Sequence, residues 1–344
     1  MMVEHYKIEL ALVCLLGLYA MNYIYGSRQN EAVVLAWANR YALHNENTLY
    51  GRNFSLVGLS GKSKRSEVIF RKNQSTYVCY ASGRRHCRSV LTTLSLKKRQ
   101  DAVSVAWYLM NPKDDRITVE VAMDGKAMAP AVFAVVRRKE VKALTNSGRD
   151  VRHFAKVCEP TKERAPQWPK RLTILAESKD LQTDLISDAA MKLVFRPEAF
   201  KRLEPYFVSM HFTTEARGGG GGAQGGGGGG GGGKGKKCLL RFVFNLPSPA
   251  AILEGAIDPL MALALHEIDV VGMHRLSPEA ARKAELRRKE VEEKEFKDTL
   301  SERQEAAQRK REDGLSAKEK LAAMEKRKKK ELKKQSKRMV MKRG

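Results

Sequence analysis

The fold follows from one apolar stretch near the N-terminus, which reads Ile8-Glu9-Leu10-Ala11-Leu12-Val13-Cys14-Leu15-Leu16-Gly17-Leu18-Tyr19-Ala20-Met21-Asn22-Tyr23-Ile24-Tyr25-Gly26. It is close to the roughly 20 residues that cross a bilayer as a helix. Glu9 lies near enough to one end to reach the headgroups, and three tyrosines gather at the other end, where aromatic belts form. The lack of polar interruption disfavours a buried helix of a soluble domain. A cleaved secretory signal is the alternative, but no A-x-A-like arrangement of small residues follows the apolar core. The stretch therefore predicts an uncleaved membrane anchor.

Charge and cysteine content favour a cytosolic body. Lys7 precedes the anchor, whereas Arg28 and Arg40 follow it, so the positive-inside rule favours a cytosolic C-terminal side. The chain holds 64 Lys and Arg against 39 Asp and Glu, a net charge of +25. Such a body suits a compartment with nucleic acid or an anionic leaflet. The five cysteines are odd in number and form no regular framework, which indicates reduced thiols.

The rest of the chain predicts an α+β fold, because strands precede helices and strands then return. Apolar alternation and continuous apolar runs predict strands at residues 68–70, 76–80, 89–96, 117–123, 131–136, 206–213 and 238–246. Helical spacing predicts helices at residues 31–47, 98–110, 139–158, 172–177, 181–193 and 252–273. In the second of these helices, Ala102, Val105, Ala106 and Leu109 line one face. The last is expected to be a core helix, since its acidic residues disfavour a second membrane span.

Four parts are expected: a short lumenal N-terminus at 1–7, a transmembrane helix at 8–26, a cytosolic mixed α/β globular domain at 27–275 and a charged helical tail at 276–344. Within the domain, residues 218–237 are nearly all glycine and end in lysines. A P-loop reading fails because Gly235-Lys236 is followed by Lys237 instead of the Ser or Thr that binds Mg²⁺. The sequence predicts a disordered surface loop there.

No catalytic or metal-binding pattern is found in the sequence. Cys79, His86 and Cys87 match no zinc spacing, so packing is the expected role. The acidic pairs at 114–115 and 292–293 are expected on a solvated turn and a solvated helix face. Gly-x-Ser-x-Gly, His-Glu-x-x-His and EF-hand motifs do not occur. We therefore predict a protein that is not an enzyme and needs no cofactor.

The tail predicts a charged helical hairpin. Ser277 can cap a first helix that ends at Asp313-Gly314, and Ser316 with Glu319 forms a capping box for a second. Apolar positions are too sparse for a sustained heptad seam, so no long homodimeric coiled coil is expected.

The end of the tail is the predicted binding site. Only two glutamates occur among its basic residues. The basic residues are Lys326, Arg327, Lys328, Lys329, Lys330, Lys333, Lys334, Lys337, Arg338, Lys342 and Arg343. This charge can dock on phosphates by counterion release. Anionic lipid and RNA both present phosphates. RNA is favoured because the tail lacks the Trp or Phe anchors of a membrane-surface helix, and contact is expected with the RNA backbone.

Several motifs occur in an order that resembles a known family. They are Phe54-Ser55-Leu56-Val57-Gly58, Leu96 with Lys98-Arg99-Gln100-Asp101, Val132-Phe133-Ala134-Val135, Leu239-Leu240 with Phe242-Val243-Phe244-Asn245 and Pro247, and Arg303-Gln304-Glu305-Ala306-Ala307-Gln308. The chain is similar to the calumin family, the coiled-coil-domain subunit of the PAT complex of the endoplasmic reticulum. The likeness extends from the anchor to the basic end.

The resemblance implies a single-span reticulum protein with a lumenal N-terminus and a cytosolic body. It implies partnership with the small membrane protein Asterix and the Sec translocon, in the insertion of nascent multi-pass membrane proteins beside the ribosome. The family's terminal helices reach toward the ribosomal tunnel exit, which fits the basic residues at 326–343.

The sequence departs from the family at its start. Family members carry a cleaved signal and an acidic lumenal segment thought to bind calcium, whereas only about seven residues precede this span, as judged from its apolar boundary. Calcium binding is therefore not expected. The short start is consistent with either a truncated sequence or a naturally reduced form of the family's protein. Two other functions remain open: a membrane-tethered RNA- or lipid-binding protein, and a calcium-homeostasis protein of the reticulum.

Overall fold

The computed structural model describes residues 2–43, 48–56, 68–124, 128, 130–216 and 237–313. The chain divides into two compact units, residues 1–284 and residues 285–344. The Gly-rich loop apart from Lys237, and the whole predicted second tail helix from Ser316, lie outside the described residues.

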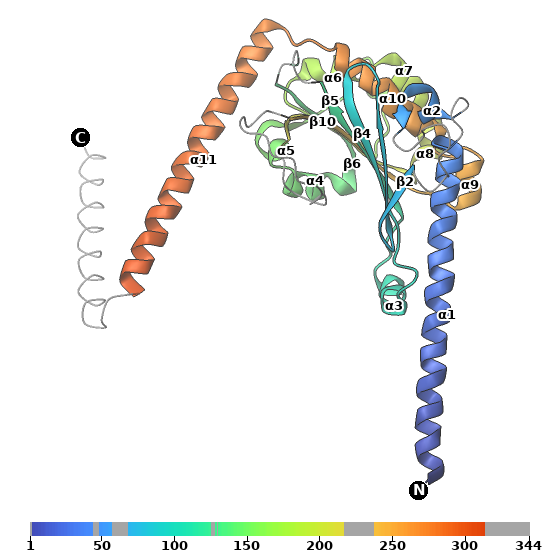
Figure 1. Ribbon diagram of the computed structural model, residues 1–344. Helices are drawn as coiled ribbons and strands as arrows, with labels where there is room; N and C mark the ends of the chain where they lie inside the picture. Colours follow the sequence, from blue (N-terminus) through green and yellow to red (C-terminus); the bar gives the residue numbers. More distant parts are fainter. Residues whose placement is uncertain are drawn as a thin grey trace. The chain divides into compact units, whose positions relative to one another are not determined.

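The first unit is built around one antiparallel sheet (Figure 1). Its strands are β1 (Ser55–Leu56), β2 (Ile69–Asn73), β3 (Thr76–Ser82), β4 (Cys87–Ser95), β5 (Arg116–Met123), β6 (Val132–Arg137), β7 (Lys156–Cys158), β8 (Leu172–Ala176), β9 (Phe207–Ala216) and β10 (Lys237–Asn245). Their order is β1-β3-β4-β5-β10-β9-β6-β8-β7, and β2 also pairs with β3. The predicted α+β fold is confirmed.

Helices make up much of the rest of the described chain. They are α1 (Met2–Tyr41), α2 (Leu49–Asn53), α3 (Ala102–Met110), α4 (Val141–Ser147), α5 (Arg149–Phe154), α6 (Lys179–Leu185), α7 (Asp188–Ala190), α8 (Pro197–Leu203), α9 (Pro249–Leu253), α10 (Asp258–Met273) and α11 (Pro278–Asp313). Short 3₁₀ turns occupy Arg138–Glu140 and Ala165–Gln167, and a π-helical turn occupies Met191–Phe195.

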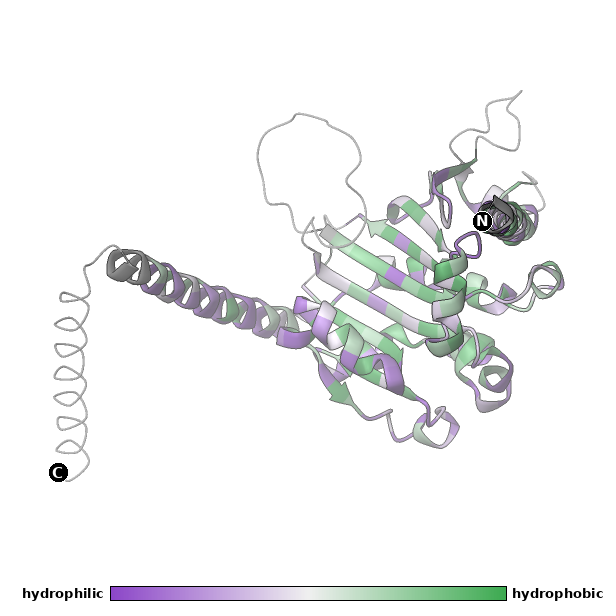
Figure 2. Cartoon of the chain, turned by 90° about the horizontal axis from the view of Figure 1, so that it is seen from below, coloured by the Kyte–Doolittle hydropathy of each residue, from purple (hydrophilic) through white to green (hydrophobic). Residues whose placement is uncertain are grey.

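Alternation along the strands creates the main core. In β5 the residues Ile117, Val119 and Val121 are buried, while the residues between them are half-exposed. Phe242 of β10 lies opposite Val119, so the buried sides of neighbouring strands coincide. Helix α10 packs with the π-helical turn over this side, and its apolar residues join the same core. Figure 2 shows the apolar and polar residues alternating along the strands.

Several helix predictions need correction. The predicted helix at 181–193 is divided among α6, α7 and the π-helical turn, and the predicted helix at 252–273 is interrupted between α9 and α10. The predicted helix at 172–177 is strand β8, because its residues pair with β6 on one side and with the edge strand β7 on the other. The predicted helix at 139–158 is interrupted at Gly148 and ends in strand β7. The apolar run at 172–177 is too short to have a decisive period, so pairing with distant strands selects its conformation.

The anchor and the first body helix form a single element. The sequence predicts separate helices at 8–26 and 31–47, but α1 runs unbroken from Met2 to Tyr41. Neither Gly nor Pro occurs between Ser27 and Tyr41, so nothing in this part of the chain favours ending the helix. Its last turns are buried in the core through Val33, Trp37 and Tyr41. The apolar segment therefore continues directly into the body.

Candidate membrane and anion site

The N-terminal two thirds of α1 present an unpartnered apolar surface. The residues from Tyr6 to Tyr41 form a helix long and apolar enough to cross a membrane. Side chains in its centre are largely exposed, from 60% for Leu12 to 73% for Leu16. Such exposure suits contact with lipid, since a helix that is apolar all round is otherwise buried in protein.

The end of this apolar segment is held by a loop at residues 97–100, which we call the docking loop. Asn22 Nδ2 lies 3.4 Å from the carbonyl oxygen of Arg99, and Asn30 Nδ2 lies 3.1 Å from that of Lys97. Gly26 lies between these two asparagines on the same helix, and its Cα faces the backbone of Arg99 and Gln100. The body therefore contacts α1 at the last two turns of the apolar segment.

A buried carboxylate fixes the shape of the docking loop. Asp115 accepts a hydrogen bond from the Lys97 backbone N–H at 2.7 Å and pairs with the Arg99 guanidinium at 2.5 Å. The same guanidinium donates to Asn30 Oδ1 at 2.8 Å, which links the loop to α1. Asp115 is only 7% exposed. The sequence-based expectation of a solvated acidic pair at 114–115 is thus wrong for Asp115. Its partners, the Lys97 N–H and the Arg99 guanidinium, lie 18 and 16 residues earlier in the chain, so no local pattern shows them.

Helix α3 follows the docking loop, and in the described part of the chain most of its side chains are exposed. Its residues Val103, Trp107, Leu109 and Met110 are 61–84% exposed. The apolar face predicted from Ala102, Val105, Ala106 and Leu109 is therefore not a core face. One feature of the sequence could have indicated an exposed apolar helix here: no charged residue occurs from Ala102 to Met110, although lysines stand at 98 and 113.

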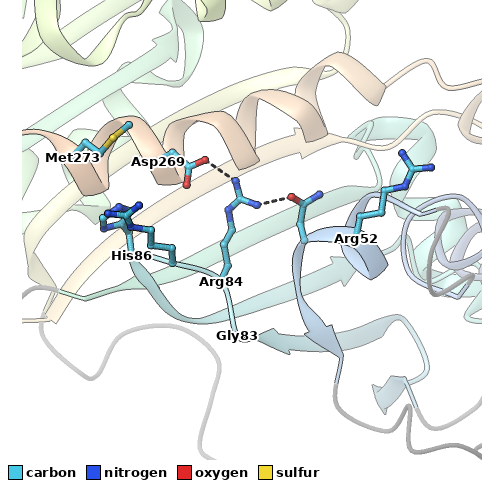
Figure 3. Close-up of a pocket in the computed structure, with 8 residues that line it drawn as sticks. Arg52, Gly83, Arg84, His86, Asp269 and Met273 are labelled. Carbon is cyan, nitrogen blue, oxygen red and sulfur yellow. Dashed lines mark hydrogen bonds and ion pairs between the residues drawn. The ribbon is translucent and has the colours of Figure 1, made fainter.

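A basic pocket lies at the other end of strands β3 and β4 (Figure 3). Its cavity of about 510 Å³ is lined by Arg52, Asn53, Gly83, Arg84, Arg85, His86, Asp269 and Met273, and we call it the arginine pocket. Arg84 donates to Asp269 at 2.6 Å and to Asn53 at 2.5 Å. These contacts hold Arg84 in place and neutralise part of the charge. The described lining brings several cationic side chains together, which suits an anion such as a phosphate.

The arginine pocket includes one residue with an unusual backbone conformation, and two buried cysteines lie in the strands beside it. His86 has a φ of 64°, which is uncommon for a residue other than glycine, and its side chain packs against Gly272. Cys79 and Cys87 are buried in the adjacent strands, and burial raises the pKa of Cys79 to about 12 and that of Cys87 to about 11. These thiols therefore stay protonated and pack as small apolar groups, as predicted.

The predicted RNA-binding residues cannot be placed. The whole set, Lys326, Arg327, Lys328, Lys329, Lys330, Lys333, Lys334, Lys337, Arg338, Lys342 and Arg343, lies outside the described residues. The first predicted tail helix is confirmed as α11, and Ser277 Oγ accepts from the Ala280 N–H at 3.3 Å at its start. Of the second unit, the structure describes residues 285–313, a highly charged part of α11.

The fold and this site define a class of protein: an α+β domain carried on a helix long and apolar enough to cross a membrane. The sequence model of the family described as PAT complex subunit CCDC47 matches residues 5–343. The chain belongs to this family.

Curated relatives agree with this assignment. The PAT complex subunit CCDC47 of Danio rerio is 33% identical over 317 residues, and that of Homo sapiens is 32% identical over 318 residues. Each of these matches covers 90% of this chain and 62% of the relative. An uncharacterized protein of Arabidopsis thaliana is 34% identical over 289 residues, which is 84% of this chain and 55% of that protein. The chain thus spans 55–62% of the length of these curated relatives.

Proposed function

We propose that this chain is a non-enzymatic scaffold of the endoplasmic reticulum membrane that acts within a PAT complex. Its partners are a small Asterix-like membrane protein, the Sec translocon, the ribosome and nascent multi-pass membrane proteins, whose insertion and folding it assists. No cofactor takes part. Family membership supports the PAT complex role.

The observation that carries the proposal is the continuity of α1. The apolar segment enters the body without a break. Asn22 and Gly26 dock against the body within the last turns of that segment, and Asn30 docks one turn later. A domain attached in this way is held at the membrane surface instead of swinging on a linker. We propose that the N-terminus is lumenal and that the body is cytosolic, beside the ribosome.

In this proposal the basic end of the tail docks on ribosomal RNA. The residues at 326–343 supply positive charge without an aromatic platform, so the interaction is with phosphates and depends on salt. The arginine pocket adds a second concentration of cations on the body itself.

The test replaces the seven basic residues Lys326, Arg327, Lys328, Lys329, Lys330, Lys333 and Lys334 by glutamine and measures ribosome co-sedimentation as a function of salt. Binding weakens, and its logarithmic salt slope falls by roughly 0.7–0.9 for each phosphate that the tail no longer neutralises. The matched control replaces seven basic residues of the mixed-charge helix α11: Arg282, Lys283, Arg287, Lys289, Lys294, Lys297 and Arg303. An equal weakening of binding in both variants would contradict a specific role for the tail end.

A second measurement separates insertion from simple tethering. Cells that carry only the tail variant are expected to accumulate misinserted multi-pass proteins, detected by glycosylation reporters placed in their loops. Loss of ribosome binding with normal insertion would favour the alternative, a membrane-tethered protein that binds RNA or anionic lipid. A calcium-homeostasis role instead predicts altered store release while insertion stays normal.

A further inference from the structure

Helix α3 combines high exposure with a complete lack of charge. Between Ala102 and Met110 every residue is apolar or neutral, yet Val103 is 75% exposed, Leu109 84% and Met110 79%. Trp107 is 61% exposed, whereas the other two tryptophans, Trp37 and Trp168, are buried. An exposed apolar patch of this kind marks an interaction site.

The position of α3 along α1 indicates what covers it. The docking loop immediately before α3 contacts Asn22 and Gly26, which belong to the apolar segment of α1. Helices α1 and α3 also contact each other, and Figure 1 shows α3 beside the middle of α1, at the end of the long strands. Gly26 is the last residue of the apolar segment. Because a helix rises 1.5 Å per residue, Asn22 lies about 6 Å further along the helix axis, within that segment. Lipid around α1 at this level would also reach α3.

The hydrogen bonding of α3 suits an apolar surrounding. Asp101 caps its first turn by accepting from the Val103 N–H at 3.2 Å and from the Ser104 hydroxyl at 2.5 Å. The Tyr108 hydroxyl accepts from the Lys98 N–H at 3.4 Å, which ties the helix back to the docking loop. Satisfied backbone groups matter because lipid offers no hydrogen bonds.

The flanks of α3 carry the residues expected at a membrane surface. Lys98 and Lys113 are exposed on either side of the helix, where their ammonium groups can reach lipid phosphates. Trp107 and Tyr108 are the residue types enriched at bilayer interfaces.

We propose that α3 inserts into the leaflet of the bilayer on the side of the body and forms a second lipid contact next to α1. The occupant of its apolar face is lipid. The inference rests on one part of the proposed function, namely that α1 crosses the membrane. Two points of contact would fix the rotation of the body about the α1 axis, which one spanning helix cannot do.

The first experiment uses a membrane-impermeant maleimide on the full chain in phosphatidylcholine vesicles, in a Cys158→Ser background. Cys14 is exposed on α1 and reports on the span, and Leu109→Cys reports on α3. Val157→Cys is the matched control, because Val157 is 67% exposed on β7, at the opposite edge of the sheet from β3 and β4. We expect Cys14 and Leu109→Cys to be protected and Val157→Cys to be labelled. Detergent solubilisation should then expose the protected positions.

Other labelling patterns overturn the inference in distinguishable ways. Labelling of Leu109→Cys with Cys14 protected would refute insertion of α3 and leave the span intact. Labelling of Cys14 would remove the span on which the inference rests.

A second experiment distinguishes lipid from a protein partner. Vesicles containing brominated phosphatidylcholine should quench the fluorescence of Trp107, and Trp107→Phe should remove most of the quenchable signal because Trp37 and Trp168 are buried. Protection of Leu109→Cys without bromine quenching would show that protein covers α3 and would overturn the assignment to lipid. Both variants change exposed side chains, so folding is not at risk.

Discussion

Gly26 and Arg99 lie in direct backbone contact. A Cβ built on Gly26 would come within 2.3 Å of both the carbonyl carbon and the carbonyl oxygen of Arg99, and within 2.5 Å of the Gln100 nitrogen. No side chain fits there, because the obstructing atoms are backbone. This contact positions the docking loop, and with it the start of α3, on the last turn of the apolar segment.

Gly26→Ala is therefore expected to separate the docking loop from α1. The added methyl group forces a backbone shift that should cost about 1–3 kcal/mol. The melting temperature of the detergent-solubilised chain should fall by about 2–4 °C for each kcal/mol. Gly17→Ala is the matched control, since nothing lies within 4 Å of a Cβ at Gly17 of the same helix. Equal melting temperatures for the two variants would show that the contact does not stabilise the protein.

Local sequence pattern is sufficient to predict much of the sheet and the apolar segment. The strands show a short-range alternation, and the segment is a continuous apolar run. The residues of β5 and β10 alternate clearly, and their strands were predicted within a residue or two. The contact of Asn30 with Arg99 spans 69 residues, and no local pattern encodes it. For the same reason the burial of Asp115 could not be predicted.

Strand β8 shows where the hydrophobic period of the sequence cannot distinguish a helix from a strand. Its residues Leu172, Ile174 and Leu175 fit a short helix as well as a strand, and pairing with β6 decides between them. The sequence could have revealed α3 as a site, since an uncharged apolar helix between exposed lysines is unusual for a surface. It predicted the helix and its apolar face, but the exposure of that face depends on what the fold places around it.

The buried carboxyl of Glu267 predicts a pH-dependent stability. Glu267 is fully buried on α10, and desolvation raises its pKa from 4.5 to about 8. The folded state therefore holds a proton that the unfolded state releases, so stability falls as pH rises from about 4.5 to about 8. Glu267→Gln should remove this part of the pH dependence and raise stability at pH 8 by about 2 kcal/mol, or about 4–8 °C.

Thermal unfolding at several pH values tests this expectation. Glu254→Gln serves as the control, because Glu254 is exposed at the end of α9. Parallel pH profiles for the wild type and Glu267→Gln would refute the role of this carboxyl.

A buried pair on the other side of the sheet predicts the opposite dependence. His211 Nε2 of β9 lies 2.8 Å from Asp150 Oδ2 of α5. Burial alone would raise the pKa of Asp150, but the hydrogen bond and charge of His211, together with hydrogen bonds from Thr213 and the Val151 backbone, lower that pKa to about 2. Because the folded pKa lies below the ordinary 3.8, the contribution is complete above that value and is lost as pH falls toward 2.

Asp150→Asn should accordingly destabilise the chain near neutral pH by about 3 kcal/mol, since it leaves a buried histidine without its carboxylate. A double-mutant cycle with His211→Gln isolates the pair from the other interactions of Asp150. Additive effects in that cycle would mean that the two side chains do not interact energetically.

The sequence contains two N-glycosylation sequons, Asn53-Phe54-Ser55 and Asn73-Gln74-Ser75, which allow a direct test of topology. The structure shows that they are not equivalent. Asn53 donates from Nδ2 to the Leu49 carbonyl oxygen at 2.8 Å and accepts from Arg84, so its amide is engaged. Asn73 is exposed at the β2–β3 turn, where its Oδ1 accepts from the Ser75 N–H at 3.1 Å. Asn73 is therefore the accessible acceptor, and its state reports on the location of the body.

With the body in the cytosol, a chain made in the presence of microsomes should carry no glycan at Asn73, and added protease should digest the body. An N-terminal tag that contains a sequon provides the matched control, because a lumenal N-terminus should receive a glycan in the same molecule. A glycan at Asn73 together with a protease-resistant body would reverse the proposed orientation. The basic residues at 326–343 would then face the lumen, away from ribosomes, and α3 would lie in the lumenal leaflet.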